Sequence, residues 1–135
     1  DCIFIDDYAH HPAEITQLVK SVKILYPEQK ICGVFQPHLF SRTRDFLDGF
    51  AEALELLDEL ILLDIYPARE LPIPGVTSEV LLNKVNKKLK MLCSKKDVLH
   101  HLNETKCNVV LSIGAGDIGA EVEKYIEVLK NKWGV

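Results

Sequence analysis

Near its start the chain reads Cys2-Ile3-Phe4-Ile5-Asp6-Asp7-Tyr8-Ala9-His10-His11-Pro12. The first four residues form a short apolar run, and Pro12 suits the first turn of a helix because an N–H there would have no partner within the helix. The stretch therefore predicts a strand, a loop and a helix in succession. The loop carries two carboxylates, a phenol and two imidazoles within six residues. A turn that only reverses the chain favours Gly, Asn, Asp, Ser or Pro, so these side chains indicate a binding site.

The same alternation of strand and helix continues along the chain. Further apolar runs occupy residues 31–35, 60–63, 90–93 and 109–113, of which 90–93 is the weakest. The first helix has an apolar stripe and ends before Pro27; the stripe consists of Ile15, Leu18, Val19, Val22 and Leu25. Apolar strands without polar alternation are typical of parallel sheets covered on both faces. We therefore expect one α/β domain over residues 1–135, with a mostly parallel sheet and helices on both faces.

Three further helices have predicted boundaries. One follows the segment 36–43 and has an apolar stripe from Phe46 to Leu57. The next is expected to be capped by Ser78 and to run as far as Leu89. The third is predicted to begin at a capping box made by Ser94 and Asp97.

Composition excludes several classes of protein. Hydrophobic residues make up 47% of the chain, which is enough for a sizeable core. The net charge of −4 argues against a general binder of nucleic-acid phosphates, because such domains carry a basic face. No apolar stretch approaches the roughly 18 residues of a membrane span. The four cysteines lack zinc-ligand spacing, so we expect reduced thiols in a cytosolic protein and no metal site. The chain begins inside an expected strand and has one methionine, Met91, which indicates a piece of a longer polypeptide.

Polar residues or glycines follow the expected strands at four places: residues 6–11, 38–42, 64–69 and 114–117. Ligands of open α/β sheets bind outside the carboxyl ends of the strands, where these four segments are expected to meet. His10, His11 and His38 lie in them, whereas His100 and His101 lack a partner motif and are expected to be structural. Arg42 and Arg44 are expected near the start of a helix. The helix dipole disfavours cations there, so an arginine at this place is best explained by a bound anion.

Two motifs suggest other functions. Residues 114–119 fit the dinucleotide pattern G-x-G-x-x-G. That pattern belongs to the first strand-turn-helix unit and needs an acidic residue on a following strand. Two readings therefore stay open: a tight turn whose N–H groups are available to another ligand, which is favoured, and a turn that serves backbone geometry alone. Asp6, Asp7 and Asp64 are placed as in a phospho-accepting receiver domain, but the lysine that a receiver needs after its last strand is replaced by Ser112-Ile113-Gly114.

Four segments resemble, in order, the C-terminal domain of the Mur ligases of peptidoglycan synthesis: residues 6–12, 35–43, 64–75 and 114–118. The double histidine and Phe35-Gln36-Pro37-His38 are similar to the alanine-adding members. The resemblance implies a Rossmann-like, three-layer fold and an enzyme of three domains, of which this chain is the last. It also implies ATP-dependent joining of L-alanine to UDP-N-acetylmuramate, through an acyl phosphate, in the bacterial cytoplasm.

The resemblance also implies roles for individual residues. Asp7 would bind the ATP ribose, and Tyr8, His10 and Arg42 would line the alanine and muramoyl end of the site. His38 would be their neighbour, and Gly114 and Gly116 would let the backbone approach the substrate. ATP and Mg²⁺ would be held mainly by the central domain. No residue of this chain is expected with certainty to be catalytic, and none to bind metal.

The resemblance further implies that the isolated domain is inactive. Its partners would be the substrates and the N-terminal and central domains of the same chain, without nucleic acid or membrane. One departure concerns Leu39, since some members have a second arginine there. A free-standing nucleotide-binding Rossmann-like module is the alternative function.

Overall fold

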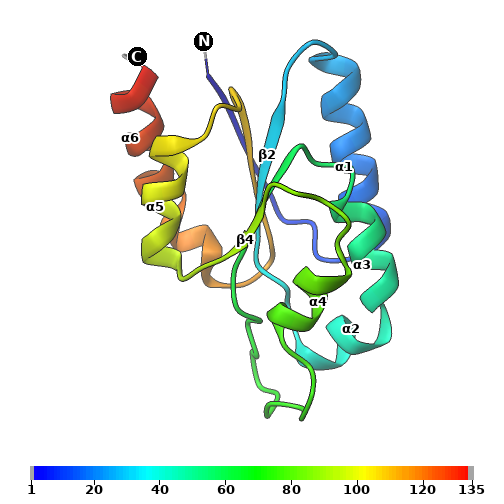
Figure 1. Cartoon of the computed structure of the whole chain (residues 1–135). Coiled ribbons are helices and arrows are strands. Elements are labelled where there is room, and N and C mark those ends of the chain that lie inside the picture. The colour runs from blue at the N-terminus through cyan, green and yellow to red at the C-terminus, as the bar shows by residue number, and fades with distance from the viewer. Residues whose placement is uncertain (1, 134–135) are drawn as a thin grey trace.

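The computed structural model describes residues 2–133, which form one parallel sheet with helices on both faces (Figure 1). The strand order is β1-β5-β2-β3-β4. Their bounds are Ile3–Asp7 for β1, Val109–Ile113 for β5, Ile31–Phe35 for β2, Glu59–Leu62 for β3 and Lys90–Leu92 for β4. Every pair of neighbouring strands is parallel. The predicted α/β fold is therefore confirmed.

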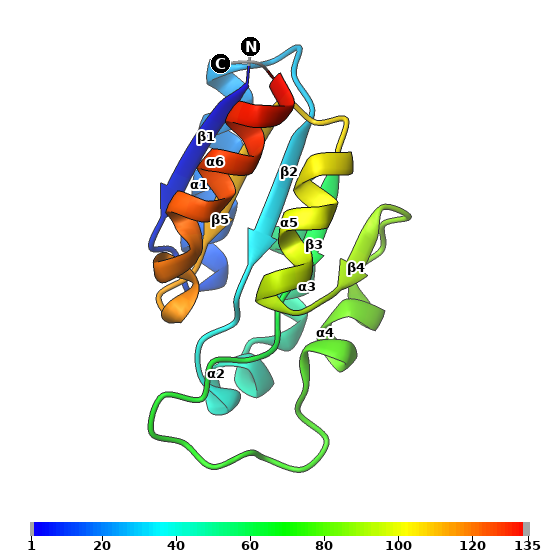
Figure 2. The same ribbon diagram turned by 90° about the vertical axis from the view of Figure 1, so that its left-hand side faces the viewer.

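The helices form an outer layer on each face of the sheet (Figures 1 and 2). One layer consists of α1 (Pro12–Leu25), α3 (Leu47–Leu54) and α4 (Ser78–Lys84), and the other of α5 (Lys95–Glu104) and α6 (Val122–Trp133). Successive strand residues serve opposite layers. In β5, for example, Leu111 and Ile113 pack in the first layer's core and Val110 in the second. None of the helices in residues 2–133 is long and apolar enough to cross a lipid bilayer.

The prediction of a single helix after the segment 36–43 is wrong. The structure has two helices, α2 (Phe40–Asp45) and α3, because the backbone leaves helical geometry at Phe46 with φ −120° and ψ 28°. The stripe predicted for α1 is correct except at Leu25, which lies at the end of the helix and is 67% exposed.

The predictions for α4 also need correction. Thr77 caps this helix by accepting the N–H of Val80 (3.2 Å), while the hydroxyl of Ser78 donates to the carbonyl of Leu63 (2.6 Å). The helix ends at Lys84 and not at Leu89. The N–H of Asn86 does not bond to a carbonyl of the helix but to the side chain of Glu55 (2.9 Å). At α5 one of the two bonds of the expected capping box is present: Ser94 accepts the N–H of Asp97 (3.3 Å), but within residues 2–133 the carboxylate of Asp97 does not bond back to the N–H of Ser94.

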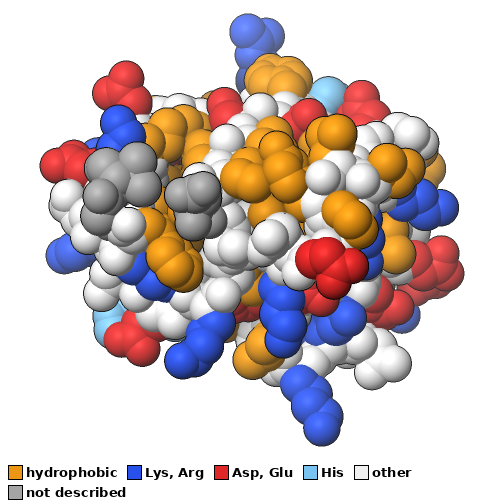
Figure 3. All heavy atoms as spheres, turned by 90° about the horizontal axis from the view of Figure 1, so that it is seen from above, with side chains coloured by type: hydrophobic (Ala, Val, Ile, Leu, Met, Phe, Trp, Pro, Cys, Tyr) orange, Lys and Arg blue, Asp and Glu red, His pale blue; other side chains and the backbone are white. Residues whose placement is uncertain are grey.

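All strands end at the same edge of the sheet, here called the carboxyl edge. At this edge lie α2, the long segment 63–77 and the 3-10 helix η1 (Asp117–Glu121). The start of β1 and the end of α6 lie at the opposite, amino edge. Figure 3 shows the amino edge from above, where hydrophobic side chains lie between acidic and basic ones.

Candidate functional site

The two aspartates at the end of β1 point to opposite faces of the sheet. The structure places both in β1 and not in the following loop, with Asp6 opposite Ser112 and Asp7 opposite Ile113 of β5. Because side chains alternate along a strand, the two carboxylates do not act as a pair. Asp7 faces α1 and lines a surface hollow with residues such as Glu14 and Gln17.

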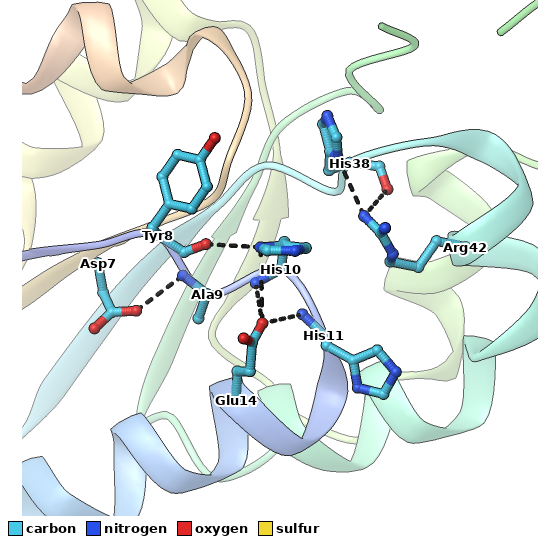
Figure 4. Close-up of polar contacts among 8 residues, drawn as sticks. All are labelled: Asp7, Tyr8, Ala9, His10, His11, Glu14, His38 and Arg42. Atoms are coloured by element: carbon cyan, nitrogen blue, oxygen red, sulfur yellow. Dashed lines mark hydrogen bonds and ion pairs between the residues drawn. The ribbon is translucent and has the colours of Figure 1, made fainter.

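The carboxylate of Asp7 is only partly used by the protein. Its Oδ1 accepts the N–H of Ala9 at 2.8 Å, and within residues 2–133 its other oxygen has no hydrogen-bond donor. Figure 4 shows Asp7 at the far side of the cluster from Arg42. Asp7 is therefore placed at the predicted edge but faces a different direction from the other polar side chains.

The double histidine divides between two tasks. The ring of His11 packs on Phe46, with 4.6 Å between the ring centroids, and this contact joins the start of α1 to the junction of α2 and α3. Glu14 accepts the N–H groups of His10 and His11, each at 3.1 Å, and these bonds hold the pKa of Glu14 below its ordinary value. The start of α1 is thereby fixed, and only His10 is left to face the other side chains of the site.

The protonation of the His10 ring follows from its contact. Its Nδ1 lies 2.9 Å from the carbonyl oxygen of Tyr8. A carbonyl only accepts hydrogen bonds, so Nδ1 carries the proton. In the neutral ring, Nε2 is then the acceptor.

His38 has the opposite arrangement. Nη1 of Arg42 lies 3.0 Å from Nδ1 of His38. A guanidinium has no acceptor, so Nδ1 of His38 accepts and the neutral ring carries its proton on Nε2. The pKa of His38 is lowered by burial and by the charges of Arg42 and His10, against a smaller opposing effect of Glu70.

Arg42 is brought to this position by a sharp turn. Leu39 has a φ of 76°, which is strained for a residue with a side chain. The turn starts α2 directly after His38, and Arg42 lies four residues further on, one helical turn away. Its guanidinium reaches back to His38 and, at 3.5 Å, to the carbonyl of that residue.

The helix-dipole argument for Arg42 and Arg44 is wrong, because both lie in the last turn of a six-residue helix, where a cation is favourable. Arg44 is paired with Asp45 at 2.8 Å. Within residues 2–133, Arg42 has no carboxylate within 4 Å. It is a half-buried cation whose side-chain partner is neutral, and such a group is suited to receive an anion.

Four of the predicted residues form a continuous row, which we call the His10–Arg42 row: Tyr8, His10, His38 and Arg42 (Figure 4). The ring centroids of Tyr8 and His10 are 5.7 Å apart, and those of His10 and His38 are 6.1 Å apart. Tyr8, at the end of the row, is 71% exposed. The row combines a phenol, two imidazoles of opposite tautomer and one guanidinium on the surface of the carboxyl edge.

The glycines after β5 pack closely on protein atoms. Gly114 is buried, with a φ of +152°, and its N–H donates to the carbonyl of Asp7 (3.1 Å). At Gly116 a Cβ would lie 2.5 Å from Oε1 of Gln36 and 2.7 Å from Cγ of Tyr66. The space freed by the missing side chain of Gly116 is therefore occupied by these two residues. An approach of substrate to the backbone here stays a prediction.

Sequence reasoning missed three residues that organise this edge. Gln36 is 4% exposed and joins β2 to η1, since its Nε2 donates to Asp117 (2.6 Å) and its Oε1 accepts the N–H of Ile118 (3.0 Å). Tyr66 stacks on His38. Glu70 accepts the N–H (3.0 Å) and the hydroxyl of Ser41 in the first turn of α2, and these bonds lower its pKa. Their positions in the segments that follow β2 and β3 are the sequence signal that could have identified them.

A second hollow of about 220 Å³ lies beside Tyr66, between the ends of β3 and β4; its lining includes Asp64, Cys93, Lys95 and Asp117. Lys95 and Asp117 form an ion pair at 2.6 Å. No group of three or more His, Cys, Asp or Glu in residues 2–133 is arranged to hold a metal ion. His100 and His101 lie on α5, outside the four segments of the carboxyl edge, with His100 3.9 Å from Glu104, and their structural role stays a prediction.

Comparison with known proteins adds independent observations. Residues 1–118 match the family described as Mur ligase, glutamate ligase domain. The UDP-N-acetylmuramate–L-alanine ligases of Parabacteroides distasonis and Flavobacterium johnsoniae are 56% and 50% identical over 127 residues, which is 94% of this chain and 28% of each relative. The crystal structure of UDP-N-acetylmuramate-alanine ligase from Thermotoga maritima superposes with a TM-score of 0.70 at 28% identity, over 95% of this chain and 26% of that one.

The chain thus spans less than a third of the length of the curated relatives it matches. The matched part is their C-terminal part. The resemblance found in the sequence is therefore confirmed, and the chain belongs to the Mur ligase family as a C-terminal domain.

Proposed function

We propose that this chain is the last domain of a three-domain ligase that adds L-alanine to UDP-N-acetylmuramate with the use of ATP. The proposal is supported by relatives of that name that are 50% or more identical over 94% of the chain. In this proposal the N-terminal and central domains belong to the same polypeptide. The domain described here completes the active site when it closes on them, and the isolated chain is inactive.

The observation that carries the proposal is the guanidinium of Arg42. It is half-buried and is held by the neutral ring of His38, without a carboxylate within 4 Å in residues 2–133. Arginine pairs with carboxylates through two parallel N–H groups, and such pairs are strong when water is excluded. Both substrates have a carboxylate. We assign to Arg42 the binding of one of them at the place where the new amide bond forms.

Tyr8 and His10 continue the binding surface from Arg42. The Nδ1 proton of His10 is used by the carbonyl of Tyr8, so its Nε2 offers an acceptor to a ligand. His38 offers the opposite, an Nε2–H donor. The His10–Arg42 row therefore presents donors and acceptors together, as a ligand with both a carboxylate and an amine requires.

Asp7 is assigned to the ATP ribose. One carboxylate oxygen is fixed by the N–H of Ala9, and the other can accept a hydrogen bond from a ribose hydroxyl. When bound, ATP supplies the phosphoryl group that activates the muramoyl carboxylate. In this proposal ATP and Mg²⁺ are held mainly by the central domain, and no residue of this domain is assigned to the metal.

The test compares two variants of Arg42 with a control variant of Arg44 in the full-length ligase. Arg42→Ala is expected to cost on the order of 2–4 kcal/mol of transition-state stabilisation, because a buried substrate carboxylate loses its partner. This corresponds to a decrease in kcat/KM of roughly 30- to 1,000-fold. The kcat/KM of Arg42→Lys is expected to lie between those of the wild type and Arg42→Ala, since the charge stays but the bidentate geometry is lost. Arg44→Ala is the matched control. It removes a charge from the same helix but breaks only an exposed pair with Asp45, so the rate should stay within about twofold. Equal rates for Arg42→Ala and Arg44→Ala would contradict the proposal.

A further inference from the structure

We infer that Tyr66 is a positioning residue, which holds His38 in the orientation that directs Arg42 toward its carboxylate. The inference rests on the proposed function of Arg42. Tyr66 itself is not expected to touch the reacting atoms. Its action is through two side chains in sequence, first the imidazole of His38 and then the guanidinium of Arg42.

The first step is the contact between Tyr66 and His38. Their rings are stacked, with 5.6 Å between the centroids and 13° between the planes. Their backbones also pair as an isolated parallel bridge. The N–H of Tyr66 donates to the carbonyl of Pro37 (2.8 Å), and the carbonyl of Tyr66 accepts the N–H of Leu39 (2.9 Å). His38 is thus attached to Tyr66 by both its backbone and its ring.

The second step is that Tyr66 is itself wedged in place. Cγ and Cβ of Tyr66 lie only 2.7 and 2.9 Å from the position that a Cβ of Gly116 would take. The amide oxygen of Gln36 lies 2.5 Å from the same position, and the amide nitrogen donates to Asp117 at 2.6 Å. Asp117 is paired in turn with Lys95. The ends of β2, β3 and β5 are therefore locked together around the Tyr66 side chain.

The third step connects the stack to Arg42. Nδ1 of His38 accepts a hydrogen bond from Arg42 only while the ring keeps its present plane and tautomer. Tyr66 covers one face of that ring, and His10 stands edge-on to it with an interplanar angle of 76°. Rotation of the ring would remove the acceptor from Arg42. The guanidinium is thus held through Nη1, and its remaining N–H groups can meet a ligand.

The alternative is that Tyr66 only fills space. The two roles differ in what happens to His38, and this can be measured on the 135-residue chain without any activity. We would record ¹⁵N NMR spectra of the histidine rings as a function of pH. In the wild type, His38 should be the Nε2–H tautomer and should titrate below its ordinary pKa.

Three variants separate the roles. Tyr66→Phe keeps the ring and should leave the His38 signals unchanged. Tyr66→Ala removes the stack, so His38 should become a mixture of tautomers and its pKa should rise, because burial is the main cause of its low value. Leu71→Ala is the control, since Leu71 lies on the same loop and is 84% exposed; it should have no effect. If Tyr66→Ala does not fold, Tyr66→Leu fills the space without an aromatic face and should behave as expected for Tyr66→Ala. Unchanged His38 signals in the folded variant would overturn the inference.

Kinetics of the full-length ligase complete the test. Tyr66→Ala should raise KM for the carboxylate substrate that Arg42 binds by roughly tenfold and leave kcat within about twofold, and Tyr66→Phe should restore the wild-type KM. Tyr66→Ala added to Arg42→Ala should have no further effect on KM. If His38 changes in the spectra but Arg42→Ala has normal kinetics, the proposed function fails while the positioning of Arg42 stands. If Arg42→Ala is impaired and Tyr66→Ala is not, the positioning role is wrong.

Discussion

Glu59 at the amino edge of the sheet and Arg42 at the carboxyl edge are both charged side chains withdrawn from water, but their partners differ. Glu59 is 9% exposed and accepts hydrogen bonds from the hydroxyl of Thr105 and, at 3.7 Å, from the thiol of Cys107. The same hydroxyl accepts the N–H of Cys107 (3.1 Å). The charge of Glu59 is thus satisfied by neighbours within the domain.

At the carboxyl edge the polar groups are fixed in position, but part of their hydrogen-bonding capacity is not satisfied by the domain. Arg42 has a neutral partner, one oxygen of Asp7 has no donor within residues 2–133, and the phenol of Tyr8 is exposed. Burial of a polar group costs free energy unless it is hydrogen-bonded. The comparison teaches that the closed network at the amino edge is satisfied within the domain, whereas the groups at the carboxyl edge keep free hydrogen-bonding capacity, which under the proposed function is used by ligands.

The largest loss of stability is expected from the closed network. Thr105→Val keeps the shape of the side chain but leaves the Glu59 carboxylate with only the weak thiol donor of Cys107, and it leaves the N–H of Cys107 without its partner. The free energy of unfolding of the chain should fall by about 2–3 kcal/mol, measured by urea denaturation. Binding and kinetics of the folded ligase should be unaffected.

Thr16→Val is the matched control for this change, since the hydroxyl of Thr16 has no hydrogen bond within residues 2–133; it should change the stability by less than about 0.5 kcal/mol. If Thr105→Val were as stable as Thr16→Val, the amino edge would not depend on its polar network. If it impaired substrate binding instead, the distinction between the two edges would be lost.

A smaller loss of stability, together with a change at His38, is expected from Gly116→Ala. A methyl group there would meet Gln36 and Tyr66 at less than 3 Å, so both must shift. Overpacking of this kind costs typically 1–3 kcal/mol, and we expect about 1–2 kcal/mol in unfolding because the neighbours are side chains. The NMR signals of His38 should shift as well. Gly119→Ala is the control, because a Cβ there has no atom within 4 Å. Equal stability and equal spectra for the two variants would contradict the wedge around Tyr66.

The sequence was sufficient to predict the sheet and the edge at which the candidate site residues lie. Apolar runs such as 109–113 and the helical stripe of α1 are local patterns, and the carboxyl ends of parallel strands must share an edge. The residues of the His10–Arg42 row were therefore found from their place after β1 and β2.

The arrangement inside the site depended on contacts between distant segments. The break at Phe46 accompanies its packing on His11 from another loop, and the turn at Leu39 bonds to Tyr66 after the next strand. The opposite tautomers of His10 and His38 follow from one carbonyl and one guanidinium, which spacing alone does not reveal. Tyr66 itself was missed because its role lies in a stack across two loops.

The smallest effect is expected from pH, and it separates the two edges once more. The groups that face His38 are Arg42 from α2, His10 from the loop before α1, and Glu70 and the ring of Tyr66 from the segment after β3. The first two charges and burial lower the pKa of His38 below its ordinary value of 6.5. Between 6.5 and the folded pKa, the unfolded chain binds more protons than the folded one, so stability should fall as pH decreases through this range.

His38→Gln tests this, because its amide oxygen can still accept from Arg42 but does not titrate. The free energy of unfolding of the wild type should decrease more steeply than that of the variant from pH 6.5 to about 5, and the two should run in parallel above pH 7.5. Carboxylates with lowered pKa, such as Glu14 and Glu70, lose their stabilising effect only as pH falls below their ordinary value of 4.5, so they do not obscure this range. Identical slopes for both chains would show that the imidazole at the carboxyl edge titrates alike in the folded and unfolded states, and that Arg42 does not sense its protonation.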